Sequence, residues 1–126
     1  MTCRGIRGAT SVNGNNVDAI IAATRELLTQ IVSANRLQVE DVAGVFFTAT
    51  PDLDAAYPAR AAREMGWTHT PLLCAQEMDV RDSPEHCIRV LVLWNTDLPP
   101  DRIQHIYLGN ARVLRPDLTS EKEEGT

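Results

Sequence analysis

The chain has 126 residues, of which 44% are hydrophobic and 23% are charged. This length and balance predict one globular domain with one core, and they exclude a fibrous or disordered chain. The longest purely apolar run, Val90 to Trp94, is far too short to cross a bilayer, and Arg4 and Arg7 stand where a signal peptide needs an apolar stretch. We therefore expect a cytoplasmic protein without a membrane segment.

The charges favour small anionic ligands over nucleic acid. The formal net charge is -5, and residues 117–126 carry four acidic residues against a single Lys, so the rest of the chain is only weakly acidic. A chain without excess positive charge offers no broad surface to nucleic acid. Every basic residue before this tail is an Arg, whose planar guanidinium suits carboxylates and phosphates, although a GC-rich genome produces the same bias.

The cysteines and histidines predict neither a disulfide framework nor a structural metal. The three cysteines, Cys3, Cys74 and Cys87, are an odd number without a CxxC pair, and no His stands at zinc-ligand spacing from them. Cys74 as a nucleophile would need a base, and no His pairs with it in a recognisable motif. The favoured interpretation of Cys74 is a small packed side chain.

The first half of the chain predicts a strand, a helix and a second strand. Residues 2–9 are β-capable and interrupted by glycines, which indicates a strand that another element approaches closely. Apolar residues then repeat at helical spacing from Val17 to Val32, after a predicted N-cap at Asn15 with Asp18 at N3. Residues 42–49 are rich in β-formers and predict a buried strand.

The second half predicts a short helix, two strands and a less regular end. A helix from Pro58 to Glu64 stops at Gly66 and presents Arg60 and Arg63 on one face. The remaining expected elements are strands at residues 72–78 and 87–94, a helical turn at 99–101, and short β segments at 103–108 and 111–114.

These elements predict a mixed α/β (α+β) domain over residues 1–118, with a mixed β-sheet and two main helices largely on one sheet face. Residues 119–126 are predicted to be a loose acidic tail. Two helices leave the other sheet face uncovered, so we expect the protein to oligomerise through that face.

Arg89 is the most informative single residue, because it lies within an apolar strand where an unpaired guanidinium is costly to desolvate. It therefore needs an anionic partner. One interpretation is an internal salt bridge to Glu77 or Asp79 on a neighbouring strand. The other is an anion bound in a pocket.

Glu77 and Tyr107 are further candidates for a site. Glu77 lies three residues after Cys74, so the two side chains face opposite sides unless a bulge or the strand end intervenes. Tyr107 either offers its hydroxyl to a carboxylate or packs in the core. Five arginines stand in or near these elements: Arg7, Arg60, Arg63, Arg89 and Arg115. If they converge, their ligand carries more than one negative group.

Several short sequence motifs occur in a characteristic order along the chain. They are Arg4-Gly5-Ile6-Arg7-Gly8-Ala9-Thr10, Ala49-Thr50-Pro51-Asp52-Leu53, Cys74-Ala75-Gln76-Glu77-Met78-Asp79-Val80 and Cys87-Ile88-Arg89-Val90, followed by Ile106-Tyr107-Leu108 and Val113-Leu114-Arg115-Pro116-Asp117-Leu118. Together they resemble the small monofunctional chorismate mutases of the AroH class, from about residue 3 to residue 118.

The resemblance implies a homotrimer whose subunits form a pseudo-α/β barrel, with active sites in clefts between subunits. It implies the rearrangement of chorismate to prephenate, on the way to phenylalanine and tyrosine. In this pericyclic Claisen shift an ether C–O bond breaks while a C–C bond forms, without proton transfer, covalent intermediate, cofactor or metal. Such an enzyme holds a compact substrate conformer and stabilises the charge that develops in the transition state.

The resemblance also assigns roles to residues. Arg89 matches the arginine that donates to the ether oxygen, and Glu77 matches the carboxylate beside the ring and its hydroxyl. Arg7 and Tyr107 match groups that hold a substrate carboxylate. The other implied binding residues are Leu73, Cys74, Ala75 and Gln76 along the cavity, Tyr57, Arg60 and Arg63 from the adjacent subunit, and Leu114 and Arg115 in or next to a flexible lid.

This chain departs from the family pattern at the rim of the expected site. Tyr57 and Arg60 stand where Phe and Lys are common, and one residue is deleted near Gly66, so substrate binding at the rim is expected to differ more than the chemistry. Two alternatives stay open from the residues alone. One is a trimeric module that binds a metabolite dianion without catalysis, and the other is a YjgF-type deaminase or hydrolase on a similar fold.

Overall fold

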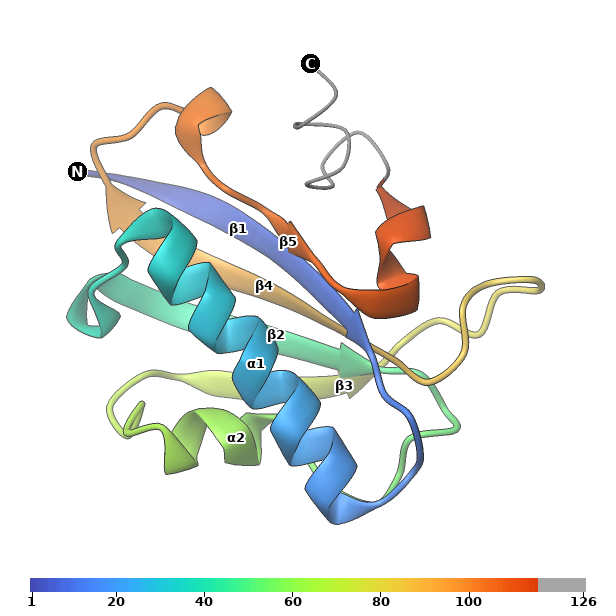
Figure 1. The fold of residues 1–126 in the computed structure, drawn as a ribbon. Helices are drawn as coiled ribbons and strands as arrows, with labels where there is room; N and C mark the ends of the chain where they lie inside the picture. Colours follow the sequence, from blue (N-terminus) through green and yellow to red (C-terminus); the bar gives the residue numbers. More distant parts are fainter. Residues whose placement is uncertain (116–126) are drawn as a thin grey trace.

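A five-stranded mixed sheet organises the molecule. Its strands are β1 (Thr2–Ser11), β2 (Val42–Ala49), β3 (Leu72–Gln76), β4 (Cys87–Thr96) and β5 (Ile106–Tyr107). They lie in the order β3-β2-β4-β1-β5, with β4 antiparallel to β1 and β2, and with β3 and β5 parallel to their neighbours (Figure 1). This computed structural model describes residues 1–115, so the predicted tail and Pro116–Leu118 lie outside the described residues.

Two helices, α1 (Val17–Asn35) and α2 (Ala59–Glu64), pack on the same face of the sheet (Figure 1). Their apolar sides meet the strands in one core, whose fully buried members include Ile6, Leu27, Ile31, Phe47 and Val92. Both helices were predicted, α1 from its apolar periodicity and α2 from Pro58 at its start and Gly66 after its end, where a φ of +94° suits glycine. Among the described residues, no helix is long and apolar enough to span a membrane.

The glycines of β1 permit the close approach that the sequence predicted. A Cβ added at Gly8 would lie 2.9 Å from the Ile31 Cδ1 atom of α1 and 2.9 Å from the Val90 Cγ1 atom of β4. Glycine at this position therefore lets α1 settle directly on the sheet.

Two local predictions were wrong. The N-cap of α1 is Asn16, whose side chain accepts the Ala19 amide at 2.9 Å, because the Asn15 side chain instead accepts the backbone amides of Asp54 and Ala55. The expected β segment at 111–114 belongs to a 3-10 helix, η3 (Gly109–Leu114).

The chain leaves the sheet early at this end for a local reason. Gly109 has a φ of +56°, and a Cβ there would collide with the Ser11 hydroxyl, which accepts the Asn110 amide at 3.1 Å. This turn ends β5 after two residues, although a strand through 108 was expected. The other short helices are η1 (Val39–Asp41) and η2 (Pro100–Arg102), the latter at the predicted helical turn.

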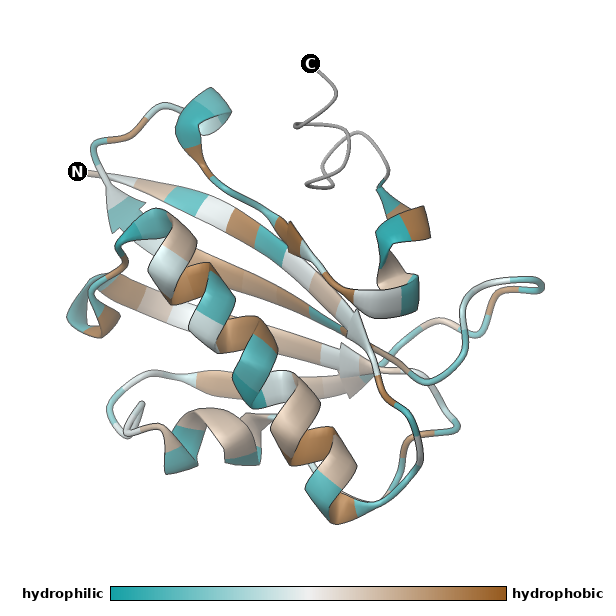
Figure 2. Ribbon diagram, viewed as in Figure 1, coloured by the Kyte–Doolittle hydropathy of each residue, from teal (hydrophilic) through white to brown (hydrophobic). Residues whose placement is uncertain are grey.

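The sheet face opposite the helices, called the outer face below, presents a row of apolar side chains. Strand register aligns Arg7, Leu91, Phe46 and Leu73 across four strands, and the last three are 38%, 45% and 56% exposed. Figure 2 shows how hydrophobic β2 and β4 are along most of their length. Neighbouring exposed apolar side chains of this size are typical of interaction surfaces.

Candidate active site

Arg89 and Glu77 form an ion pair on the outer face. Thr48 of β2 and Arg89 of β4 are direct partners in the register, so their side chains share this face. Glu77 directly follows β3, where its amide donates to the Ala49 carbonyl at 2.9 Å. Its Oε1 atom lies 3.2 Å from Arg89 Nε and accepts the Thr48 hydroxyl at 2.8 Å. Of the two partners that the sequence left open for Arg89, the structure therefore selects Glu77.

The Arg89 side chain is less buried than the apolar strand around it suggested. It is 46% exposed, against 22% for Glu77, because it points away from the helices. The ion pair forms at the Nε atom of the guanidinium, and the Arg89 side chain also interacts with the buried Cys87 thiol beneath the site. A cavity of about 310 Å³ lies at this pair, lined also by Thr50, Met78 and Cys87.

Arg7 and Tyr107 flank the ion pair on the same sheet face. Arg7 of β1 lies opposite Leu91 and is thus a diagonal neighbour of Arg89, at a typical separation of about 7–8 Å. Tyr107 lies in the same row as Ala9 and Arg89. The structure therefore gathers Arg7, Glu77, Arg89 and Tyr107 at one part of the sheet.

Tyr107 is also a packing residue, as the second interpretation held. It is only 9% exposed and packs with Ala9, Cys87 and Ala111, with the partly buried Leu114 against the same cluster. Leu114 ends η3 and Arg115 follows it, half-buried. Both therefore lie beside this part of the site, whereas the rest of the expected lid falls outside the described residues.

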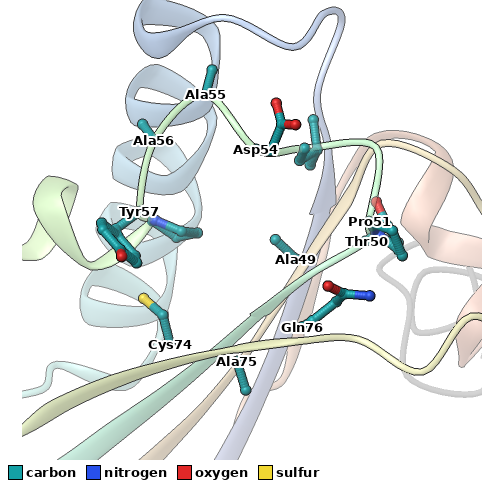
Figure 3. Close-up of a pocket in the computed structure, with 12 residues that line it drawn as sticks. Ala49, Thr50, Pro51, Asp54, Ala55, Ala56, Tyr57, Cys74, Ala75 and Gln76 are labelled. Carbon is teal, nitrogen blue, oxygen red and sulfur yellow. The ribbon is translucent and has the colours of Figure 1, made fainter.

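A second cavity of about 450 Å³ lies between the carboxyl ends of β2 and β3 and the loop that leads to α2. Tyr57, Cys74, Ala75 and Gln76 line it, and Figure 3 shows the Tyr57 ring facing the Cys74 sulfur. Burial raises the pKa of the Cys74 thiol, although a hydrogen bond with the Ala59 backbone and the charge of Arg63 oppose this. Cys74 is thus held as a neutral thiol, which agrees with a packing role and not with a nucleophile.

Arg60 and Arg63 project from α2, close to the second cavity. Both are exposed, and Arg60 Nε lies 2.8 Å from Glu64 Oε2 one helical turn later. Arg63 is near enough to Cys74 to act on its ionisation. Neither arginine lines this cavity.

The segment 73–77 was expected to line one cavity, but the structure divides it between two. Cys74, Ala75 and Gln76 line the larger cavity, Glu77 lines the smaller one with Arg89, and Leu73 lines neither. The strand pleat explains the division, because Cys74 and Glu77 turn to different sides as their spacing predicted. The described residues therefore form two separate cavities, called the two partial sites below.

The sequence analysis did not identify the polar residues that fix the start of β4, the strand that carries Arg89. The Thr50 hydroxyl donates to Asp52 at 2.5 Å and accepts the Cys87 amide at 3.0 Å, and Asp52 Oδ2 accepts the His86 amide at 3.0 Å. Burial opposes the ionisation of Asp52, but the Thr50 hydroxyl, the His86 amide and the His86 charge together lower its pKa. The Thr-Pro-Asp turn was a usable signal, because such turns place side-chain acceptors near strand starts. Thr48, a polar residue in an apolar strand, was another.

The donor set offers no metal centre within the described residues. Nowhere in residues 1–115 do three or more His, Cys, Asp or Glu side chains gather as ligands would. The three cysteines are free thiols. What the two partial sites present is positive charge, one carboxylate and aromatic hydroxyls, a set suited to a small molecule with several carboxylates.

Known proteins share both the sequence and the fold. The chorismate mutase AroH of Bacillus subtilis (strain 168) is 46% identical over 123 residues, which is 97% of each chain. The chorismate mutase AroH of Thermus thermophilus is 52% identical over 118 residues, 93% of this chain and 97% of the relative. A solved chorismate mutase from Clostridium thermocellum superposes with a TM-score of 0.86 at 49% identity, covering 87% of this chain and 98% of that one.

The family comparison covers the same elements that build the two partial sites. The description "Chorismate mutase type I" matches residues 3–118, a span that contains every residue singled out above. With its paired Arg89 and Glu77 on an open sheet face, the chain belongs to the chorismate mutase type I family.

Proposed function

We propose that this protein rearranges chorismate to prephenate, an isomerisation in the biosynthesis of aromatic amino acids. The observation that carries the assignment of the chemistry is the Arg89–Glu77 ion pair, fixed by strand register on the outer face. Bond breaking runs ahead of bond making in this reaction, so negative charge grows on the ether oxygen while the ring becomes positive. A cation and a carboxylate held 3.2 Å apart are a preorganised dipole for that charge separation.

In this proposal each residue acts by position and charge alone. The guanidinium of Arg89 donates to the ether oxygen, and Glu77 accepts from the ring hydroxyl and faces the developing positive charge. Arg7 and Tyr107 hold one substrate carboxylate, because they flank Arg89 on the same sheet face. Since no side chain transfers a proton, kcat should be nearly flat between about pH 6 and 8.

We further propose a homotrimer in which the two partial sites of different subunits complete each other. The apolar row of Phe46, Leu73 and Leu91 supports a covered outer face, because it adjoins the Arg89 site. Burying that face would also desolvate the Arg89–Glu77 pair and strengthen its electrostatic effect. The second cavity, with Tyr57 and Cys74 and with Arg63 near it, would then face the neighbour's Arg89. The proposed location is the cytoplasm.

The activity is tested with purified protein and chorismate, by following the loss of diene absorbance and the formation of prephenate. The Arg89→Ala variant should lose activity, and Arg25→Ala, on the exposed side of α1, serves as the matched control. A wild-type protein that leaves chorismate unchanged would refute the proposal. These outcomes also separate it from a dianion-binding module and from a YjgF-type enzyme, neither of which the comparisons favour.

The shared site is tested by complementation between two inactive variants. Arg89→Ala damages one partial site and Arg63→Ala the other, so co-expressed subunits in a trimer regenerate intact interfaces. Random assembly of equal amounts should restore about one quarter of wild-type activity. Each site needs an intact Arg89 from one subunit and an intact Arg63 from its neighbour, and each requirement is met in about half of the cases. No recovery, with a trimeric mass confirmed by light scattering, would show that each site belongs to one subunit.

A further inference from the structure

His105 has no part in the function proposed above, yet its ring joins the two strands that carry Arg7 and Tyr107. The Arg7 backbone amide donates to His105 Nδ1 at 2.9 Å. β5 contributes only two ladder positions, Gly8 with Ile106 and Ala9 with Tyr107, so this bond extends the β1–β5 pairing by one position. A ring nitrogen thus stands where a longer strand would present a backbone carbonyl.

The segment that holds the ring is itself fixed from α1. The buried Asn35 side chain donates to the Gln104 carbonyl at 3.0 Å, and its Oδ1 atom accepts the Gln104 amide at 2.8 Å. The same amide nitrogen of Asn35 also donates to the Ile31 carbonyl at 2.9 Å. Asn35 therefore binds both the amide and the carbonyl of Gln104. His105, the next residue, is held in place and cannot move with Arg7 if β1 and β5 separate.

The bond requires a neutral imidazole. When Nδ1 accepts from an amide, the single ring proton resides on Nε2. A second proton on Nδ1 would place this N–H group against the Arg7 N–H group, so the hydrogen bond would be lost. We propose that neutral His105 is a positioning residue, which holds Arg7 beside Tyr107 for the substrate carboxylate, and that its protonation loosens this end of the site. This inference rests on the proposed function, because Arg7 and Tyr107 are its carboxylate-binding pair.

The surroundings of the ring favour the neutral form. Burial lowers the pKa of His105 from its ordinary value of 6.5, and it is the single cause of the shift. Asp101, Arg102 and Tyr107 are the charged or titratable groups on the chain around His105, and Arg7 on β1 and Arg36 at the end of α1 belong to the elements packed beside it. No carboxylate contributes to the shift, Asp101 included, so burial favours the neutral ring and keeps its pKa below the ordinary value of 6.5.

The test measures kcat and KM separately between about pH 5 and 8 for the wild type, His105→Ala and His105→Asn. In the wild type, KM should rise as the pH falls below 6.5 while kcat stays flat. His105→Ala lacks the acceptor, so its KM should be raised about two- to tenfold at every pH, the effect of one lost hydrogen bond. His105→Asn offers an acceptor that does not titrate, and it should restore a low KM and remove the acid rise.

The controls are the other two histidines. His69→Asn and His86→Asn remove the imidazole rings of other loops and should leave the rise in KM in acid unchanged. If His86→Asn abolished that rise, or if His105→Asn retained it, the inference would be overturned. A wild-type KM that falls or stays constant in acid would overturn it as well, whereas failure of the proposed function would appear as no prephenate at any pH.

A readout independent of substrate is the exchange of the Arg7 amide proton with solvent, measured by NMR in the ligand-free protein. Its protection relative to the unfolded chain should drop in acid with the midpoint of His105, and it should be low at all pH values in His105→Ala. Protection that is unchanged by pH would contradict the proposal. Because this measurement uses the wild-type chain, it remains decisive even if His105→Ala does not fold.

Discussion

Replacing Arg89 separates the chemical role of the guanidinium from its structural role. The ion pair with Glu77 is half-exposed on the Arg side, and such pairs contribute about 0–1 kcal/mol to folding. Glu77 also keeps its hydrogen bond from Thr48 when Arg89 is truncated. We therefore expect Arg89→Ala to fold normally, with its melting midpoint lowered by no more than about 5 °C.

The loss of turnover should be far larger than the loss of stability. Removing a donor to an oxygen that gains negative charge costs about 3–4 kcal/mol, or about 10²- to 10³-fold in kcat. Arg89→Lys keeps the charge, but a single ammonium group cannot hold Glu77 through one nitrogen while offering two others to the substrate. Most of the loss should therefore persist in Arg89→Lys.

The assay is steady-state kinetics with chorismate, alongside circular dichroism melting of each variant and of the Arg25→Ala control. A change in kcat with little change in KM identifies an interaction made in the transition state. The reasoning is refuted if Arg89→Ala keeps its kcat within tenfold of the wild type, or if Arg89→Lys is fully active.

Three further predictions concern residues around the site. Asp52→Asn should reduce the free energy of unfolding at pH 7 by about 1 kcal/mol. The pKa of Asp52 is lowered from 3.8, so its stabilisation is present above pH 3.8 and is lost as the pH falls through the folded pKa. The free energies of unfolding of variant and wild type, measured in urea, should therefore converge in acid. Gly8→Ala should destabilise by about 1 kcal/mol in urea, since its Cβ would meet side chains of α1 and β4 at 2.9 Å, and an unchanged midpoint would show that they yield freely. Asn15→Ala removes the acceptor of two backbone amides in the loop before Tyr57, so KM should rise a few-fold while kcat is preserved. A fall in kcat as large as the rise in KM would contradict a positioning role for this loop.

The sequence determined the elements whose signal is repeated along many neighbouring residues. The helical period of α1 and the apolar runs of β2 and β4 predicted all three, and the glycines of β1 predicted the close approach of α1. Family resemblance supplied the candidate site residues, because several motifs in order carry more information than any single spacing. These features depend on residues close together in the chain, which is why they could be predicted without coordinates.

The tertiary structure decided which distant residues meet. Asn15 does not cap α1 because its side chain is taken by a loop forty residues away, and Arg89 pairs with Glu77 because strand register sets Thr48 and Arg89 side by side. The pleat of β3 sent Cys74 and Glu77 to different cavities. Register and pleat arise from pairing between strands far apart in the sequence, so no local pattern specifies them.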